Sequence, residues 1–319
     1  MERYKELIDA YLAGIRLPEH PARLYDPVRY VLAPGGKRVR PSLTLMAAEA
    51  YGKHADEALP AAAALEIFHN FTLLHDDLMD HAGLRRGRPT VHKKWDENTA
   101  VLSGDAMVYV AQQQLEIYPA ETYKTLQSLF NRTALEICEG QQEDMDFETR
   151  NDVPWDEYRE MIRKKTAVLL GAAMQFGAII AGRDGNEQKL LYDAGVHLGL
   201  AFQIADDYLD TFGDESFGKQ IGGDIREGKK TFLYIKTLEA MNHRERETFK
   251  RLYGQAEKTN ETLREITRIM EAHNIPETAR QAIAGHTRRY EELIRRSAMP
   301  PDFQKAFIRL GEKLSERTK

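Results

Sequence analysis

Two groups of aspartates with the same internal spacing stand out in the sequence, and each follows a run of apolar residues. The first group is His75-Asp-Asp-Leu-Met-Asp80, and the second is Ala205-Asp-Asp-Tyr-Leu-Asp210. An α-helix turns by about 100° per residue, so the aspartates of each group fall on one face of a helix. Adjacent carboxylates repel one another, and an apolar helix tolerates them only when cations lie nearby.

Divalent cations are the natural partners of such acidic faces. Mg²⁺ is typically held by one or two carboxylates together with waters and substrate phosphates. A single DDxxD motif would suit a solvated acidic helix equally well, but two copies in apolar helices favour a metal site. The sequence therefore predicts two or three Mg²⁺ ions held by six carboxylates, namely Asp76, Asp77, Asp80, Asp206, Asp207 and Asp210.

Helical periodicity adds other residues to these faces. His69 lies seven residues before Asp76, and Gln203 lies three before Asp206, so both project close to the aspartates. Alone, His69 would be interpreted as a hydrogen-bonded core histidine. Gly199 also lies on the second face, where we expect it to leave room for an apolar substrate tail.

Basic residues accompany both acidic groups. Lys37 and Arg40 precede a helix that can begin at Pro41, and a helix start of this kind favours anions. Arg85 and Arg86 follow the first group after a short turn, and guanidinium groups make forked contacts with phosphate oxygens. Lys164 and Lys165 begin an apolar helix rich in small residues. Lys219, Lys229 and Lys230 flank Asp224 after the second group. The GxxxxGK[ST] spacing of a P-loop is absent, so these clusters predict a different site for a phosphorylated metabolite.

The composition limits the possible classes of protein. The chain has 319 residues, of which 42% are apolar and 30% charged, which is enough apolar material for a large core. Its formal net charge of −5 gives no general attraction to nucleic acid. Cys138 is the single cysteine, which excludes an internal disulfide and a cysteine-rich zinc site and agrees with a reducing cytoplasm.

The pattern of apolar residues is helical through most of the chain, and strands are hard to place. The first residues are charged and lack the apolar region of a secretory signal. The most apolar stretch, 167–182, is shorter than the ~18 residues that a membrane span requires. No linker rich in Pro, Gly and Ser divides the chain. We therefore expect an all-α protein with one domain, residues 1–319, no membrane span and a cytoplasmic location.

The order of the motifs resembles that of the trans-isoprenyl diphosphate synthases, the polyprenyl synthetase family. GGKRVRP, ExxH, HDDxxD, RRGxPT, KT, QIxDD and GKxxGxDxxxGKxT follow one another here as they do in that family. The resemblance implies a helical bundle around a deep central cavity (the isoprenoid synthase fold), a homodimer, and condensation of isopentenyl diphosphate with an allylic diphosphate.

The resemblance also implies a role for each matching residue. It assigns the isopentenyl diphosphate pocket to Lys37, Arg40, His69 and Arg86, and contacts with the allylic diphosphate to Arg85, Lys165, Lys219 and Lys229. Asp76, Asp80 and Asp206 would bind Mg²⁺ directly, whereas Asp77, Asp207 and Asp210 would act through water or orient other groups. Thr166 and Gln203 would lie near the allylic cation.

Product length is implied by two further residues. In similar enzymes, bulk at the fifth and fourth positions before the first aspartate limits the growing chain, and here those residues are Phe71 and Thr72. The aromatic ring of Phe71 resembles short-chain enzymes of the farnesyl and geranylgeranyl type, although ideal helix geometry turns Phe71 away from the aspartates. A product of fifteen or twenty carbons is therefore expected.

Other functions remain possible on the same fold. A longer-chain polyprenyl diphosphate synthase would share the motifs. A terpene cyclase would share the first aspartate motif, but cyclases usually carry an Asn/Ser/Glu motif in the second position. A non-catalytic subunit commonly loses aspartates, and none is missing here.

Overall fold

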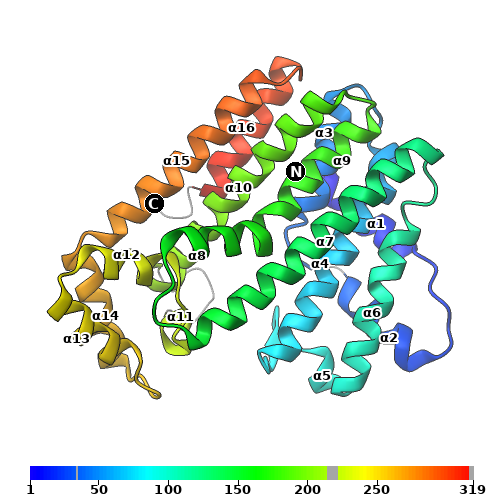
Figure 1. Ribbon diagram of the computed structural model, residues 1–319. Coiled ribbons are helices and arrows are strands. Elements are labelled where there is room, and N and C mark those ends of the chain that lie inside the picture. Colours follow the sequence, from blue (N-terminus) through cyan, green and yellow to red (C-terminus); the bar gives the residue numbers. More distant parts are fainter. Residues whose placement is uncertain (34, 214–221, 316–319) are drawn as a thin grey trace. The chain divides into compact units, whose positions relative to one another are not determined.

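The computed structural model describes residues 1–33, 35–213 and 222–315 (Figure 1). The chain forms two compact units, the first from Met1–Arg132 and Ala172–Lys189 and the second from Thr133–Gly171 and Leu190–Lys319. Helices α7 (Ala120–Thr149), α9 (Val168–Ile180) and α10 (Gly185–Phe212) each contribute residues to both units. The expectation of one domain stays a prediction.

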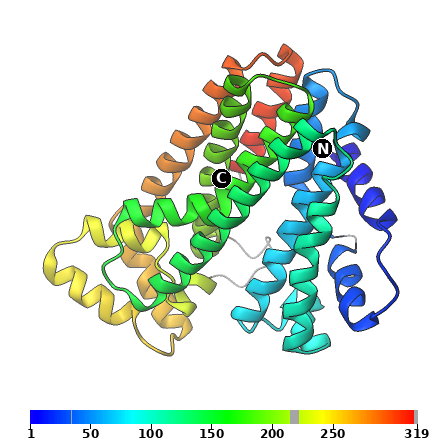
Figure 2. The same cartoon turned by 45° about the vertical axis from the view of Figure 1, so that its right-hand side comes forward.

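The first unit is built around α4. Its other elements are α1 (Glu2–Gly14), α2 (Ala22–Leu32), α3 (Val39–Ala50), β1 (Leu84–Arg85), β2 (Arg88–Pro89), α5 (Val91–Lys94) and α6 (Glu97–Gln113). Helix α4 (Ala55–Met79) is buried along most of its length, and its small residues Ala61–Ala64 let neighbouring helices approach closely. Helices α3 and α6 pack against it, with α6 alongside α4 in both ribbon views (Figures 1 and 2).

A short hairpin follows α4 and supplies the only strands of the described residues. Leu84 pairs with Pro89, and Arg85 pairs with Arg88. The two connecting residues, Arg86 (φ 53°) and Gly87 (φ 73°), both have positive φ, as a tight type I′ turn requires. The sequence predicted only a short turn before Arg85 and Arg86, because strands of two residues are too short to show alternation.

The second unit contains the end of α7 and the helices of the C-terminal half. After α8 (Trp155–Ile162) come α11 (Gly223–Glu227), α12 (Phe232–Ala240), α13 (His243–Tyr253), α14 (Asn260–Ala272), α15 (Ile275–Arg296) and α16 (Pro301–Ser315). Its core includes the aromatic residues Tyr158, Phe232, Phe249 and Tyr253. Helices α15 and α16 lie side by side, as Figure 2 shows.

A π-helical turn, η1 (Arg163–Ala167), joins α8 to α9 and carries Lys165 and Thr166. Such turns are frequent at functional sites. A Cβ added to Gly140 of α7 would overlap the backbone of Lys165, and one added to Gly199 of α10 would lie 2.5 Å from Ala167 Cα. Two glycines therefore allow η1 to approach its neighbours. The expectation that Gly199 leaves room for a substrate tail was wrong, because Ala167 occupies that room.

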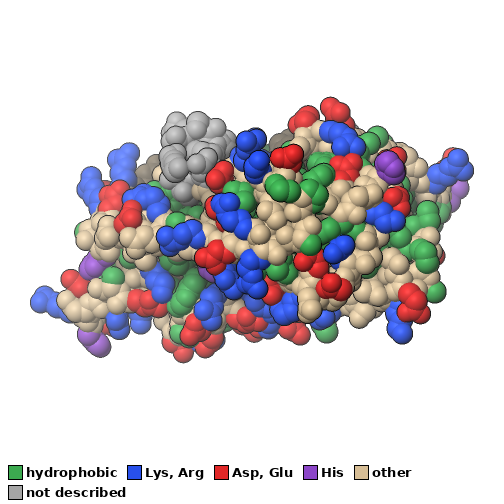
Figure 3. Space-filling model, turned by 90° about the horizontal axis from the view of Figure 1, so that it is seen from above, with side chains coloured by type: hydrophobic (Ala, Val, Ile, Leu, Met, Phe, Trp, Pro, Cys, Tyr) green, Lys and Arg blue, Asp and Glu red, His purple; other side chains and the backbone are tan. Residues whose placement is uncertain are grey.

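None of the helices among the described residues is long and apolar enough to cross a bilayer. On the face shown in Figure 3, acidic, basic and hydrophobic side chains are interspersed. That face therefore carries no extended region of one charge.

Candidate active site

The first acidic group lies at the C-terminal end of α4. Asp77 is buried, Asp76 is half-buried and Asp80 is exposed just beyond the last helical residue. A helix C-terminus carries partial negative charge, so carboxylates are unfavourable there unless a cation offsets them. Burial raises the pKa of Asp77, and the ion pair with Arg85 opposes that rise. A cation bound beside the first acidic group would therefore stabilise its carboxylates.

The hairpin directs two neighbouring arginines to different targets. Arg85 Nε donates to Asp77 Oδ1 at 2.6 Å, which ties the hairpin to the first acidic group. Arg86 Nη1 instead donates to Gly35 O at 3.1 Å, in the loop before α3. The Arg86 guanidinium lies 3.0 Å from where a Cβ of Gly36 would be, and Gly36 has φ 93°. The positive φ favours glycine at that position, and a side chain there would displace the Arg86 guanidinium.

A cationic cluster surrounds His69 in the same unit. Arg40 Nη1 lies 3.1 Å from His69 Nε2. Burial and the charges of Arg40, Arg86, Arg85 and Arg38 hold the pKa of His69 well below its usual value, so the imidazole is neutral at pH 7. Lys37 is exposed in the loop that precedes these residues. Guanidinium groups around a neutral ring make a site suited to a phosphate-bearing anion.

The second acidic group occupies the last turns of α10. Asp207 is 3% exposed and accepts hydrogen bonds from the Tyr158 hydroxyl at 2.5 Å, Gln203 Nε2 at 3.0 Å and the Phe232 backbone N–H at 3.2 Å. Asp206 and Asp210 are half-buried, and Asp210 Oδ2 accepts from the Asp224 N–H at 2.9 Å. Asp207 is therefore an anchored side chain, whereas its two companions are more accessible.

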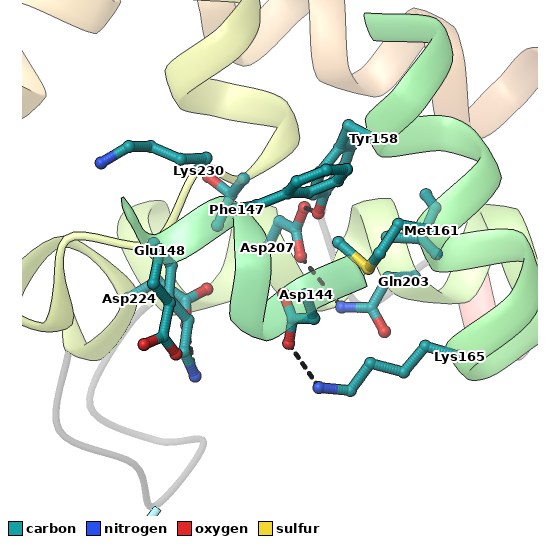
Figure 4. Close-up of a pocket in the computed structure, with 13 residues that line it drawn as sticks. Asp144, Phe147, Glu148, Tyr158, Met161, Lys165, Gln203, Asp207, Asp224 and Lys230 are labelled. Atoms are coloured by element: carbon teal, nitrogen blue, oxygen red, sulfur yellow. Dashed lines mark hydrogen bonds and ion pairs between the residues drawn. The ribbon is translucent and has the colours of Figure 1, made fainter. Parts of the chain in front are cut away.

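A pocket in the second unit gathers most of the remaining candidates. It is lined by Asp144, Phe147, Glu148, Tyr158, Met161, Ile162, Lys165, Gln203, Asp207, Asp224, Lys229, Lys230 and Thr231. The Lys165 ammonium reaches Asp144 Oδ2 at 2.5 Å (Figure 4). Thr166 Oγ1 donates to Gln203 Oε1 at 2.9 Å, so Gln203 is fixed between Thr166 and Asp207.

Negative charge accumulates in this pocket. Burial, followed by repulsion from Asp207 and Asp210, raises the pKa of Asp224 to about 7, although Lys229 opposes the rise from 3.9 Å. Burial also raises the pKa of Asp207 to about 6 despite its three hydrogen-bond donors. Groups with shifts of this kind inside a cleft are frequent at functional sites. The pocket therefore favours additional cations beside its lysines.

Asp144 and Tyr158 were not predicted as site residues from the sequence. Each reaches the pocket only because helices α7 and α8 bring it there, and neither belongs to a recognisable spacing pattern. The local sign in the sequence was Gly140, a glycine within a helix, where α7 approaches the segment of Lys165 closely. Asp224 appeared in the sequence only as a neighbour of the lysines, yet it lines the same pocket.

Some predicted site residues lie elsewhere or are not described. Lys219 lies outside the described residues. Among the residues that are described, no three His, Cys, Asp or Glu side chains form a preformed metal cluster. The first acidic group belongs to the first unit and the second acidic group to the second unit. Joint action of the two groups on one substrate stays a prediction.

Phe71 and Thr72 lie one to two turns before the first acidic group. The Phe71 ring contacts the His75 ring, with 4.7 Å between centroids, and the Phe68 ring at 5.4 Å. His75 Nε2 is 3.2 Å from Val101 O of α6, so this side of α4 faces α6. Thr72 Oγ1 donates to His69 O at 2.8 Å. The placement of Phe71 agrees with the ideal helix geometry expected from sequence.

Comparison with known proteins extends over nearly the whole chain. Residues 21–270 match the model of the family described as polyprenyl synthetase. The chain is 38% identical over 294 residues to a short chain isoprenyl diphosphate synthase of Methanothermobacter thermautotrophicus, which covers 92% of this chain and 90% of the relative. It is 43% identical over 235 residues to a geranylgeranyl diphosphate synthase of Methanosarcina mazei, with 73% and 72% covered.

A solved structure gives the same result for the fold. The crystal structure of a geranylgeranyl pyrophosphate synthase matches with a TM-score of 0.92 and 47% identity, over 100% of this chain and 98% of that one. These findings confirm the all-α fold and the resemblance carried by the order of the motifs. The chain therefore belongs to the polyprenyl synthetase family.

Proposed function

We propose that this protein is a Mg²⁺-dependent trans-prenyltransferase that joins isopentenyl diphosphate to an allylic diphosphate and releases a product of fifteen to twenty carbons. The observation that carries the proposal is the cationic cluster of Arg40, His69 and Arg86 in the same unit as Asp76 and Asp80. A second set of carboxylates and lysines lines the pocket of the other unit. The relatives' printed names include geranylgeranyl and short chain isoprenyl diphosphate synthases.

The donor set fits magnesium. All six predicted ligands offer carboxylate oxygens, which hard divalent cations prefer, and four of them are not fully buried. Repulsion from Asp207 and Asp210 adds to burial in raising the pKa of Asp224, so these carboxylates lie close enough to share a cation. We infer two or three ions, each held by few carboxylates and completed by substrate oxygens. Bound there, Mg²⁺ would supply the positive charge that a departing diphosphate requires.

The residues of the chain then have distinct tasks in the reaction. Arg85, Lys165 and Lys229 would stabilise the diphosphate that leaves when the allylic carbon–oxygen bond breaks. Arg40, Arg86, Lys37 and His69 would hold isopentenyl diphosphate so that its double bond forms the new carbon–carbon bond. The proton lost from the isopentenyl unit would pass to the released diphosphate. Thr166 and Gln203, held together at 2.9 Å, would present oxygen dipoles to the allylic cation.

An assay of product size tests the proposed reaction. The protein is incubated with Mg²⁺, labelled isopentenyl diphosphate and, in turn, allylic diphosphates of five, ten and fifteen carbons. Products of fifteen to twenty carbons are expected. Conversion of the allylic substrate to hydrocarbon without isopentenyl diphosphate would identify a cyclase instead. Activity that requires a second protein would identify a non-catalytic subunit.

Phe71→Ala tests the proposed limit on chain length. Removing the ring abolishes its contacts with Phe68 and His75 and opens space on the side of α4 that faces α6. We expect products longer by at least one five-carbon unit, while the total rate of condensation stays within about threefold. Chromatography of the prenyl alcohols measures the shift. Phe71→Tyr keeps the ring and serves as the control, and identical products from Phe71→Ala and wild type would exclude the role.

We further propose a homodimer, in a cytoplasmic location. Helix α6 exposes apolar side chains on one face. Leu102 is 60% and Tyr109 67% accessible, and the two residues are seven positions apart. Residues at this spacing share a helix face, and such a face is a usual site of protein association. Leu102→Glu is expected to give a monomer in light scattering at micromolar concentration. Ala306→Glu on α16 adds the same charge elsewhere and should leave the dimer intact; a monomeric wild type would refute the proposal.

A further inference from the structure

Arg38 is a buried charge at the junction between α3 and the loop that precedes it, with Lys37 in that loop and Arg40 in the first turn of the helix. Its side chain is inaccessible to solvent, whereas Lys37 is exposed and Arg40 half-buried. The backbone of Arg38 has φ 47° and ψ 38° and forms the N-cap of α3. A left-handed conformation is uncommon for a residue other than glycine, and it persists only where the surroundings determine it strongly.

Three helices supply those surroundings. Arg38 Nη1 donates to Glu66 Oε1 of α4 at 2.6 Å, and Arg38 Nε donates to Asp9 Oδ1 of α1 at 2.8 Å. Arg38 Nη2 reaches Leu32 O at the end of α2 at 3.3 Å. Glu66 also accepts from Asn70 Nδ2 at 3.2 Å, so its carboxylate is held on both sides. The loop is thus fixed at one residue to helices that precede and follow it.

The fixed residue lies between two contacts of the cationic cluster. On one side, Gly35 O accepts the hydrogen bond of Arg86. On the other side, Arg40 Nη1 lies 3.1 Å from His69. A rotation at Arg38 would therefore move both contacts together. A buried ion pair is weak evidence for a gain in stability, because desolvation offsets its Coulomb energy, so the precise placement of the loop is the better explanation of its presence.

We propose that Arg38 is a positioning residue of the isopentenyl diphosphate pocket and that Asp9 of α1 completes its anchorage. The inference rests on the proposed function of the pocket. Arg38 does not face the substrate; it orients Lys37 and Arg40, which do. Helix α1 precedes residues 21–270, the part of the chain that matches the family model. A helix outside the matched region thereby contributes to substrate affinity.

Variants of α1 separate this role from simple support of the fold. Asp9→Ala removes the acceptor that α1 offers to Arg38, and we expect KM for isopentenyl diphosphate to rise about 5- to 20-fold. KM for the allylic diphosphate and kcat at saturation should change less than about twofold, because Arg85, Lys165 and Lys229 are untouched. Asp9→Asn retains an acceptor oxygen and should recover most of the affinity.

Glu49→Ala is the matched control. Glu49 of α3 holds α1 through Arg3 and the Tyr4 hydroxyl, and these contacts do not involve Arg38. It therefore weakens the docking of α1 without removing the acceptor of Arg38. KM for isopentenyl diphosphate should stay within about twofold of wild type. An equal increase in Glu49→Ala and Asp9→Ala would show that only the docking of α1 matters, and would overturn the proposal.

A paired substitution tests Arg38 itself. Arg38→Leu with Glu66→Leu replaces a buried ion pair by apolar groups, a change that proteins often tolerate without loss of stability. We expect a Tm close to that of wild type and weaker calorimetric binding of isopentenyl diphosphate measured without Mg²⁺. A stable paired variant with wild-type affinity would refute the role of Arg38. Absence of condensation by the wild type would instead refute the proposed function.

Discussion

Asp76→Asn is expected to lower kcat by about two to three orders of magnitude at saturating substrates. The substitution keeps the size of the side chain but removes a charge from the C-terminal end of α4, where the helix dipole adds negative potential. An amide oxygen is a weaker ligand for Mg²⁺ than a carboxylate, so the charge that stabilises the departing diphosphate is reduced. Asp206→Asn should have an effect of the same size, measured in the same condensation assay.

Asp56→Asn is the control for this prediction. Asp56 lies in the first turn of the same helix and is exposed, so its loss should leave kcat within about twofold of wild type. The concentration of Mg²⁺ that gives half-maximal rate should rise in Asp76→Asn and stay constant in Asp56→Asn. An Asp76→Asn enzyme with more than a third of the wild-type kcat would remove Asp76 from the proposed metal site.

Asp207→Leu is expected to lower the free energy of unfolding by about 2–4 kcal/mol. The substitution leaves three donors without their acceptor: the Tyr158 hydroxyl, the Gln203 amide and the Phe232 N–H. Part of this loss is offset, because burial raises the pKa of Asp207 to about 6 and the buried charge is itself unfavourable. Urea denaturation followed by circular dichroism measures the change.

Asp206→Leu provides the comparison, because the Asp206 carboxylate is half-buried and accepts none of the three hydrogen bonds that anchor Asp207. Its unfolding free energy should change by less than about 1 kcal/mol, while its activity falls as sharply as that of Asp206→Asn. Equal stabilities of the two leucine variants would contradict the distinction between an anchored Asp207 and an accessible Asp206.

The helix faces were predictable from sequence because they depend on local periodicity. The DDxxD spacing placed Asp76 and Asp206 in apolar helices, and both lie in the last turns of α4 and α10. The inward turn of Arg38 was not predictable. Lys37, Arg38 and Arg40 belong to one basic run, and only the left-handed backbone at Arg38 decides which of them is buried.

Contacts between segments that are distant in the chain also could not be predicted from the sequence. The pairing of Lys165 with Asp144 depends on the close approach of α7 to η1. Gly140 allows this approach because glycine has no side chain. The opposite directions of Arg85 and Arg86 depend on a turn whose two residues both have positive φ. Each is a tertiary effect of a backbone conformation that the pattern of apolar and polar residues does not encode.

The π turn has a consequence for insertions and deletions in the polypeptide. A π turn contains one residue more than an α-helical turn, so η1 is equivalent to a single inserted residue within a continuous helix. The wider turn lets consecutive residues reach partners on two helices, Asp144 for Lys165 and Gln203 for Thr166. A one-residue deletion within it would restore regular helical winding and preserve both flanking helices, yet turn one of the two side chains out of reach of its partner.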